Sequence, residues 1–319
     1  MNLYNNQISI FRRSYGLIQT MGVFLILVII LSIFLPRFMT FTNIINVLNQ
    51  LSANLVVSAG MTIIILTAEF DISVGAVLAL TACVAALLMP DMAILPAVGI
   101  SLLIGPLFGL LHGVIVTKGK IPSFIITLGT MMIARGLAFI VTGGKVVSGI
   151  PDGFKILGQG TIKGLPIVFF VVIIVYTLGY ILLKKSPFGK KIYAVGANRQ
   201  VAMLSGINAD KIKIIAFVAV GFSASLGGIL LLSRMMSVQA YTAQGMEFDC
   251  IAAVVIGGTS LTGGAGNILR TIIGVLIIGM IRNALNLAHI DVQWQMVANG
   301  SIIILAVLLD ALRRRLNVT

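Results

Sequence analysis

The strongest constraint on the fold is a succession of apolar runs along the whole chain, most of them about 20 residues long, the length that a helix needs to cross a bilayer. Charged residues make up only 10% of the chain, against about 25% in soluble domains. Too little polar surface therefore remains to cover a water-soluble particle. The sequence predicts an all-α polytopic membrane protein. The better-defined runs cover residues 16–35, 44–67, 74–89, 93–117, 122–142, 165–183, 212–234, 268–287 and 293–312, and a weaker one begins near Phe248.

The basic residues predict the topology. The net charge is +13, and Lys and Arg gather in short segments between the apolar runs. If the N-terminus is inside and the chain crosses ten times, Lys118, Lys120, the loop 184–211 and Arg313 to Arg315 all become cytoplasmic, as the positive-inside rule requires. Nine crossings would carry the triple arginine across the membrane. We therefore expect about ten transmembrane helices with both termini in the cytoplasm. Nucleic acid is not expected as a partner, because no basic stretch carries stacking aromatics.

The N-terminal run, Gly16 to Leu35, follows Arg12 and Arg13 and could be mistaken for a secretory signal. It is too long for one, and no small-x-small cleavage pattern follows it. We expect it to be the first membrane helix.

At least one membrane segment is expected to be short or broken. The run from Glu247 to Gly258 is too short to span about 30 Å of hydrocarbon, and it continues into a glycine-rich stretch. There, Gly258 to Ala265 reads GTSLTGGA, which resembles a phosphate-binding loop, but Gly264 and Ala265 replace its Lys and its hydroxyl residue. The sequence predicts a break or tight turn beside a translocation path, involving Gly257, Gly258, Gly263 and Gly264. A second candidate break is Thr67 to Ala76.

Small residues line one face of the fourth run at four-residue intervals, which predicts a close approach by a neighbouring helix. They are Ala97, Ser101, Gly105, Gly109 and Gly113. Pro106 in the same run is expected to kink the helix.

Ionisable residues at membrane depth are costly and are functional candidates by default. On this ground we place Glu69, Asp71, Arg135, Glu247 and Asp249 on the translocation path. The alternative for each is an interfacial residue or a helix cap, and Asp71 in particular could cap the run that follows it.

No constellation for catalysis or metal binding is visible. His112 and His289 have no companion at ligand spacing, and Cys83 and Cys250 lie within apolar runs, where they behave as small hydrophobes. His112 lies in an apolar run and could be either a satisfied core histidine or a proton relay. The sequence predicts neither an enzyme, nor a cofactor, nor a metal site.

The loop 184–211 is long and looks organised. Asn198 is a suitable N-cap for a short helix from Arg199 to Ser205, Gly206 is a suitable stop, and Asn208 or Asp210 could cap the next membrane helix. A helix of about two turns cannot cross the bilayer. It either docks into a groove on a partner through Val201, Ala202 and Leu204, or it packs on its own protein.

Three ordered motifs resemble the permease subunits of bacterial sugar ABC importers, a group that includes the ribose, xylose and autoinducer-2 permeases. They are SPFGKKIYAVGANRQVAMLSGI (Ser186 to Ile207), IAAVVIGGTSLTGGAGNILRTIIGVLIIGMIRNALNL (Ile251 to Leu287) and AEFDISVGAVLALT (Ala68 to Thr81). The resemblance covers nearly the full length. One departure is Cys250, where such permeases usually have alanine after the acid.

The resemblance implies one transmembrane permease domain, residues 1–319, in a bacterial inner membrane. It implies a subunit that works as a pair, with two cytoplasmic ATP-binding subunits and an extracytoplasmic solute-binding protein as partners. The segment Asn198 to Ile207 would contain the coupling helix that contacts the ATPase. We assign that contact to Asn198, Arg199, Gln200, Val201, Ala202, Leu204, Ser205 and Gly206.

The expected function is therefore translocation of a small, pentose-like sugar. Two alternatives stay open at this point. One is a branched-chain amino acid ABC permease, which shares the general layout. The other is a gradient-driven secondary transporter, in which Glu69, Asp71 or Asp249 would carry the coupling protons.

Overall fold

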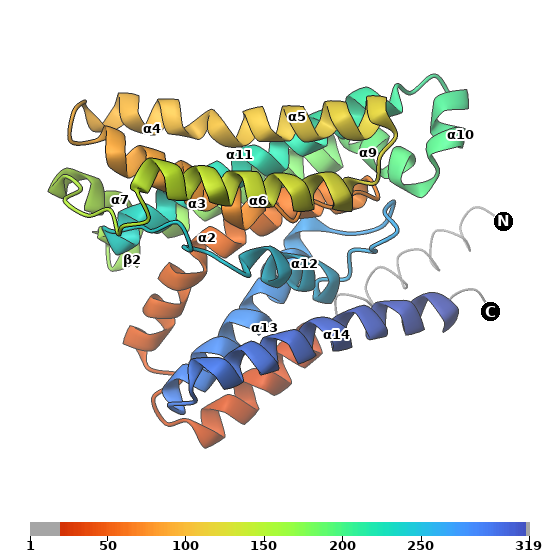
Figure 1. Ribbon diagram of the computed structural model, residues 1–319. Helices are drawn as coiled ribbons and strands as arrows, with labels where there is room; N and C mark the ends of the chain where they lie inside the picture. Colours follow the sequence, from red (N-terminus) through yellow and green to blue (C-terminus); the bar gives the residue numbers. More distant parts are fainter. Residues whose placement is uncertain (1–19, 317–319) are drawn as a thin grey trace.

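The computed structural model of the protein describes residues 20–316, and this part is almost entirely helical (Figure 1). A helix from Thr20 to Phe34 comes first. The helices that follow are α2 (Phe41–Leu66), α3 (Val74–Leu88), α4 (Ile94–Leu102), α5 (Ile104–Gly119), α6 (Ser123–Thr142), η1 (Asp152–Phe154), α7 (Lys155–Gln159), α8 (Ile167–Tyr180), η2 (Ile181–Lys185), α9 (Pro187–Ala197), α10 (Arg199–Leu204), α11 (Ala209–Met235), α12 (Met246–Ile256), α13 (Ile268–Leu287) and α14 (Val292–Leu316). Two-residue strands β1 (Thr161–Ile162) and β2 (Leu165–Pro166) form a small antiparallel hairpin, in which Thr161 pairs with Pro166.

Every predicted apolar run forms a helix or a pair of helices. Six helical stretches among the described residues are long and apolar enough to cross a membrane. This confirms a multi-pass helical membrane protein, while the count of ten crossings stays a prediction. Arg12, Arg13 and the start of the first run lie outside the described residues, as do the side chains of Arg313 to Arg315.

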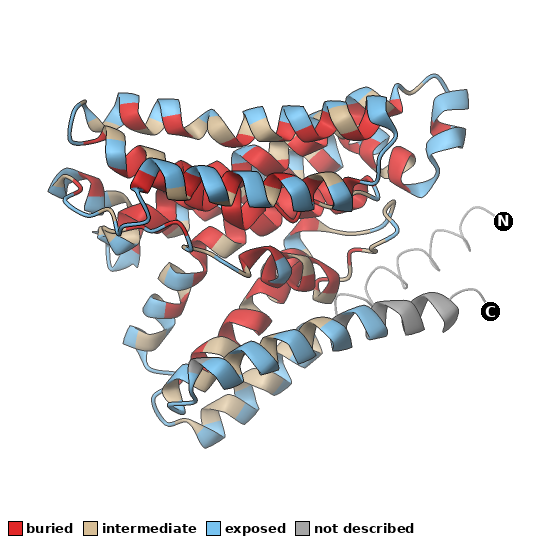
Figure 2. Cartoon of the chain, in the orientation of Figure 1, coloured by how far each residue is buried: buried red, intermediate tan, exposed pale blue. Residues whose placement is uncertain are grey.

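The core is built around α2 and α11. About 78% of the most apolar part of α2 and 67% of that of α11 are buried, against 22% for α6 and for the α4–α5 stretch. Figure 2 shows the same contrast, with buried residues concentrated in the middle of the molecule. In a bilayer, the apolar residues on the outer faces of α4, α5 and α6 are covered by lipid or protein.

The small-residue face of α4 and α5 packs on α11, as predicted. The backbone of Gly105 meets the carbonyl of Gly221, and a Cβ atom added to either glycine would overlap the other residue's backbone. The predicted kink is also present, since α4 ends at Leu102 and α5 begins at Ile104. Pro106 has no N–H to donate to the carbonyl of Leu102, which explains the break at this point.

Candidate functional site

Helix α12 is the short membrane segment that the sequence predicts. It has 11 residues, which at 1.5 Å per residue is about half of the hydrocarbon thickness. The chain reaches it through a non-helical stretch, residues 237–245, which we call the approach segment. This segment begins after Met236 and ends at Gly245, both with positive φ, at 51° and 85°. The unwound backbone therefore precedes α12 as well as following it.

Arg135 of α6 satisfies the backbone of the approach segment. Its Nη1 atom donates hydrogen bonds to the carbonyl oxygens of Ala240, at 2.6 Å, and Thr242, at 2.9 Å. One turn further along α6, the Phe139 ring packs edge-on against Tyr241 with centroids 4.8 Å apart. Non-helical backbone at membrane depth needs such partners, because it lacks the hydrogen bonds that a helix makes within itself.

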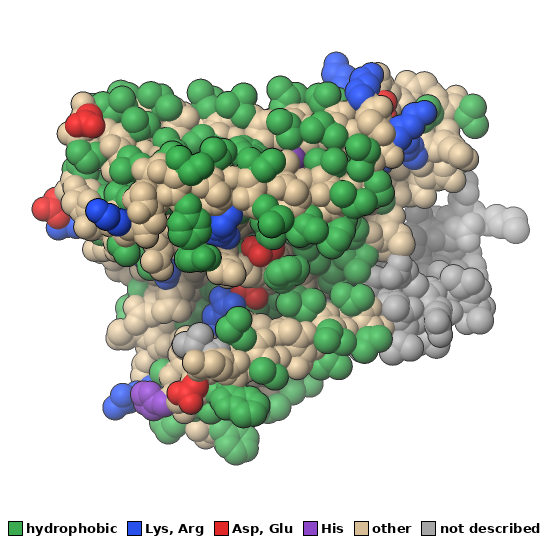
Figure 3. All heavy atoms as spheres, viewed as in Figure 1, with side chains coloured by type: hydrophobic (Ala, Val, Ile, Leu, Met, Phe, Trp, Pro, Cys, Tyr) green, Lys and Arg blue, Asp and Glu red, His purple; other side chains and the backbone are tan. Residues whose placement is uncertain are grey.

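A cavity of about 1000 Å³ lies beside the approach segment and α12. In Figure 3, acidic and basic side chains gather in a hollow in the middle of this face, among apolar ones. The lining residues come from α6, the approach segment, α12, α13 and α14 and include both charged groups and amides. They are Met131, Met132, Arg135, Gly136, Tyr241, Gln244, Gly245, Glu247, Phe248, Asp249, Arg282, Gln295, Met296, Asn299, Gly300 and Ile303.

The charges of this cavity are balanced, two acidic and two basic. Arg282 donates from Nη2 to Asp249 Oδ2 at 2.6 Å, with the Asp249 side chain 6% exposed and that of Arg282 42% exposed. Glu247 is buried, and its Oε1 accepts the N–H of Gly245 at 3.2 Å. Its Oε2 lies against Gly75, at the start of α3. The structure thus brings together three of the predicted path residues, Arg135, Glu247 and Asp249.

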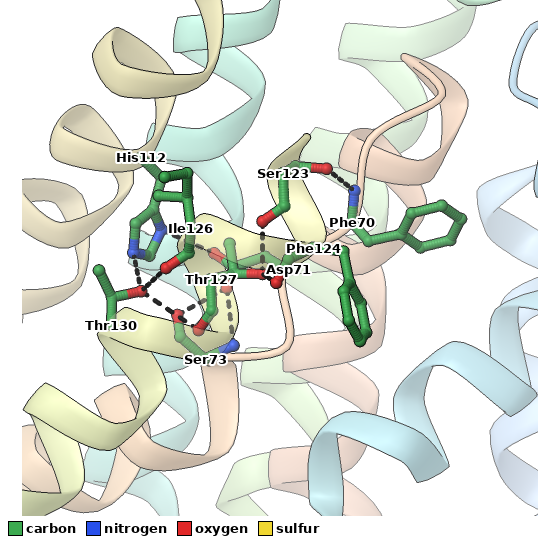
Figure 4. A network of polar contacts seen from close by, with 9 residues as sticks. All are labelled: Phe70, Asp71, Ser73, His112, Ser123, Phe124, Ile126, Thr127 and Thr130. Carbon is green, nitrogen blue, oxygen red and sulfur yellow. Dashed lines mark hydrogen bonds and ion pairs between the residues drawn. The ribbon is translucent and has the colours of Figure 1, made fainter. Parts of the chain in front are cut away.

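Asp71 lies away from this cavity, in a buried polar network between α3, α5 and α6 (Figure 4). Its Oδ1 accepts the N–H and the hydroxyl of Ser73, at 2.9 and 2.6 Å, and its Oδ2 lies 3.2 Å from Nδ1 of His112. The other ring nitrogen of His112 is 2.7 Å from the Thr130 hydroxyl. His112 is thus a core histidine with a partner on each side. Asp71 precedes α3, but the N-cap position belongs to Ser73.

Glu69 forms an ion pair with Lys213 near the start of α11, and both side chains are 13% exposed. Neither residue lines the cavity. The role of Glu69 and Asp71 on a path stays a prediction.

The glycine-rich stretch after α12 forms a tight turn, but at one end of the helical bundle. Gly258, Gly263 and Gly264 all have positive φ, between 72° and 83°. The Gly264 N–H donates to the carbonyl of Leu66, the last residue of α2, at 3.0 Å. Gly264 also packs against Ala197, the last residue of α9, so closely that a Cβ atom would overlap it. These glycines, with Gly257, are not among the residues that line the cavity, and their place on a path stays a prediction.

The loop 184–211 has the predicted caps and short helix, but it also contains α9 (Pro187–Ala197), which the sequence analysis did not predict. Asn198 accepts the Val201 N–H at 3.1 Å as N-cap of α10, Gly206 has φ 79°, and Asn208 caps α11. In Figure 1, α10 projects from the end of the molecule opposite α7. Ala202 packs on its own protein and is 3% exposed, whereas Val201 is 57% and Leu204 89% exposed. Each of the two alternatives for this helix therefore applies to one of its faces. The face with Ala202 packs on its own protein, and the face with Val201 and Leu204 is exposed, as docking on a partner requires. Gln200, Ser205 and Gly206 are exposed, and Arg199 forms an ion pair with Asp210 at 2.7 Å.

The sequence analysis did not identify several of the residues that line the cavity, among them Arg282, Gln244 and Asn299. Arg282 could have been found, because it is a cation deep inside the apolar run 268–287, twelve residues beyond Arg270. Gln244 and Asn299 carry no comparable signal. No group of three or more His, Cys, Asp or Glu suited to a metal ion occurs within residues 20–316.

The family model and the similar proteins are all described as permeases. The sequence model of the family described as branched-chain amino acid transport system / permease component matches residues 43–309. The chain is 43% identical over 291 residues to the ribose import permease protein RbsC of Haemophilus influenzae, covering 90% of each chain. It is 41% identical over 301 residues to RbsC of Bacillus subtilis, covering 92% of this chain and 94% of that one. It is also 36% identical to the L-arabinose transport system permease protein AraH of Escherichia coli, over 94% of this chain and 91% of that one. No solved structure matches significantly.

Proposed function

Because this chain belongs to the family of branched-chain amino acid transport system permease components, we propose that it is the membrane-spanning subunit of an ATP-binding cassette importer for a small, pentose-like sugar. The relatives at 36–43% identity are named for ribose and L-arabinose. The protein would act as a transport subunit, with ATP hydrolysis on a separate cytoplasmic subunit and delivery of the sugar by an extracytoplasmic binding protein.

The observation that carries the proposal is the composition of the cavity. Its two acids and two bases balance each other, and two of the four, Asp249 and Arg282, form an ion pair. The amides of Gln244, Gln295 and Asn299 add neutral donors and acceptors. A wall of this kind suits an uncharged, polyhydroxylated solute, because it offers hydrogen bonds in both directions without selecting a net charge.

The same cavity supports a working pair of subunits. Charged side chains at membrane depth face protein or water, not lipid. The hollow between α6, α12 and α14 would therefore be closed by a second copy or a paralogue of this chain. A path formed in this way would take in Arg135, Glu247 and Asp249.

We assign the contact with the ATPase to α10. Its exposed face combines the apolar Val201 and Leu204 with the basic Arg199. The basic residues Lys190 and Lys191 of the preceding helix, α9, are also exposed. The glycine turn packs on the end of α9 and on the end of α2. Movement of α10 and α9 would thus be transmitted directly to α2 and to α12. On this assignment α10 and both chain termini are cytoplasmic.

The test is to express the chain with its neighbouring gene products and to combine gentle detergent extraction with uptake assays. We expect an ATP-binding subunit with an intact G-x-x-x-x-G-K-[ST] loop to co-purify, and uptake of labelled ribose or arabinose to require ATP. Charge reversal at Lys190, Lys191 and Arg199 should release the ATPase. Uptake of leucine in place of sugars would indicate the amino acid alternative. Uptake driven by a proton gradient with no ATPase present would refute the importer assignment.

A further inference from the structure

A small amphipathic pocket lies outside the solute cavity, where α9 packs on the start of α11. Its volume is about 260 Å³. Two lysines line it, Lys191 of α9 and Lys211 of α11, together with Asn208, the N-cap of α11. Its other lining residues are apolar and are Phe188, Ile212 and Ile215. The pocket therefore combines positive charge with an apolar wall.

Neither lysine of this pocket has an acidic partner in the part of the chain that the structure describes. Asp210, next to Lys211, pairs instead with Arg199. None of the ion pairs between described residues involves Lys191 or Lys211, and both side chains are exposed. The first turn of α11 adds the partial positive charge of a helix start. The pocket thus favours an anion that two ammonium groups can share.

An open apolar stripe on α11 leads away from this pocket. Between residues 215 and 233, most side chains of α11 are buried and five are not. These five are Ile215, Val218, Ala219, Phe222 and Leu226. Each lies three or four residues from another, and Lys211 lies four residues before Ile215, so all of them share one face of the helix. Ile215 is 39% and Phe222 45% exposed. The stripe is continuous with the pocket, because Ile215 belongs to both.

The length of the stripe matches one leaflet of a bilayer. From Lys211 to Phe222 the helix rises about 16 Å, at about 1.5 Å per residue, and half of the hydrocarbon core is about 15 Å thick. After Leu226, residues 227–233 are all buried in the protein itself. A ligand that fits has an anionic group at the membrane surface and an apolar part that ends near the middle of the membrane. A phospholipid of one leaflet has this shape, whereas a protein in the aqueous phase cannot reach along the stripe.

We infer that the pocket and the stripe bind an anionic phospholipid of the cytoplasmic leaflet. Its phosphate is shared by Lys191 and Lys211, and one acyl chain lies along Ile215 and Phe222. The choice of leaflet rests on the proposed function, which places α10 in the cytoplasm. In Figure 3, basic side chains gather at this end of the molecule, and anionic lipids of the cytoplasmic leaflet attract such groups. The phosphate offsets the repulsion between the two lysines and so holds α9, which leads into α10, against α11.

The test uses tryptophan fluorescence and brominated lipids, which quench a tryptophan that their acyl chains contact. The chain has one tryptophan, Trp294, which is first replaced by phenylalanine. Phe222→Trp then places a single tryptophan on the stripe. The complex with its ATPase is reconstituted in phosphatidylcholine vesicles that contain brominated phosphatidylglycerol or, at the same fraction, brominated phosphatidylcholine. The ratio of the two quenching constants measures the preference for the anionic lipid.

A tryptophan elsewhere on the apolar surface reports the lipid that surrounds the whole protein. Leu107 of α5 is 62% exposed. It lies at a depth similar to that of Phe222, since Gly105 of α5 packs on Gly221 of α11. Leu107→Trp, made in place of Phe222→Trp, should be quenched about equally by the two lipids.

A pair of lysine substitutions separates the pocket from the general positive charge of this end. Lys211→Ala removes a lysine that lines the pocket, and it is preferred to a change at Lys191, which adjoins the proposed ATPase contact. Lys118→Ala removes an exposed lysine at the end of α5 that is not among the pocket's lining residues. Both are made together with Phe222→Trp.

We expect Phe222→Trp to prefer phosphatidylglycerol by about fivefold or more, because one basic residue near the membrane surface changes the affinity for anionic lipid by about this factor. Lys211→Ala should lower the preference about fivefold, and Lys118→Ala should lower it by less than about twofold. The inference is overturned if Phe222→Trp has no greater preference than Leu107→Trp, or if the two lysine variants behave alike.

Two further results bear on the assignment. Loss of the preference on addition of inorganic phosphate would indicate a site for free phosphate and would overturn the lipid assignment. If Phe222→Trp does not fold, native mass spectrometry of the same two lipids on the wild-type and Lys211→Ala complexes decides by the same ratio. A wild-type chain that neither takes up sugar nor retains an ATPase would instead overturn the proposed function, while the quenching ratio could still be measured on the chain alone.

Discussion

Replacing Arg135 tests whether the approach segment forms a functional wall of the cavity. The Arg135 guanidinium holds two carbonyl oxygens of this segment, at 2.6 and 2.9 Å. A hydrogen bond from a charged donor contributes about 1.5–3 kcal/mol net. Taking the lower figure for each, because the site borders an open cavity, Arg135→Leu costs the local structure about 3 kcal/mol. That shifts the equilibrium between the ordered and the disordered segment about 100-fold.

The assay is initial-rate uptake of labelled sugar, together with thermal unfolding of the purified complex in detergent. We expect uptake to fall about 10- to 100-fold in Arg135→Leu, with a smaller loss in Arg135→Lys, which keeps one charged donor. Thermal stability should change little, since the core between α2 and α11 is untouched. Lys145→Leu, which removes an exposed cation from the loop after the same helix, is the control. Uptake within twofold of wild type in Arg135→Leu, at equal expression, would refute the argument.

Three further substitutions follow from local geometry. Leu204→Asp should release the ATPase and stop uptake, because it places a charge on the most exposed face of α10, whereas Ile156→Asp, at an exposed position of α7, should do neither. Gly105→Ala should lower the unfolding free energy by about 1–3 kcal/mol, measured by thermal unfolding in detergent, because the added methyl overlaps the backbone of α11. Gly129→Ala, with no heavy atom within 4 Å of the added Cβ, should not. Asn198→Ala should weaken α10 by about 1 kcal/mol through loss of its cap, and should lower ATPase retention in the same pull-down.

The helical segments were predictable because the bilayer itself dictates their length and polarity. The run 122–142 is found as α6, Ser123–Thr142, within a residue at either end. The caps of α10 and α11 were equally predictable, since Asn198, Gly206 and Asn208 act on neighbouring residues through their own side chains or backbone conformation. In both cases the deciding interactions lie within a few residues of one another in sequence.

The cavity was predictable only in part, because its walls come from five separate segments. The acids Glu247 and Asp249 and the cation Arg135 were found from their cost at membrane depth, but the partners of Arg135 are backbone carbonyls more than 100 residues away. Arg282 was overlooked although it pairs with Asp249. The glycine turn packs against the ends of α2 and α9, and its expected place beside the path stays a prediction. Sequence indicates that the backbone bends there, but only tertiary packing decides what lies next to the bend.

The junction of α3 and α12 offers a test that separates packing from chemistry. A Cβ atom on Gly75 would overlap the Glu247 carboxylate and would lie 2.8 Å from the carbonyl oxygen of Ala243. Gly75→Ala should therefore push α12 and α3 apart and lower uptake. Gly75→Ala combined with Glu247→Ala removes the first overlap and leaves only the second. If the junction closes the path by shape, the double variant should recover part of the uptake that Gly75→Ala loses, and the two effects should be non-additive. If the Glu247 carboxylate itself contacts the solute, the double variant should be no better than Glu247→Ala alone, and Glu247→Ala should be as inactive as Gly75→Ala. Strict additivity of two small effects would mean that the helices do not meet at this point during transport.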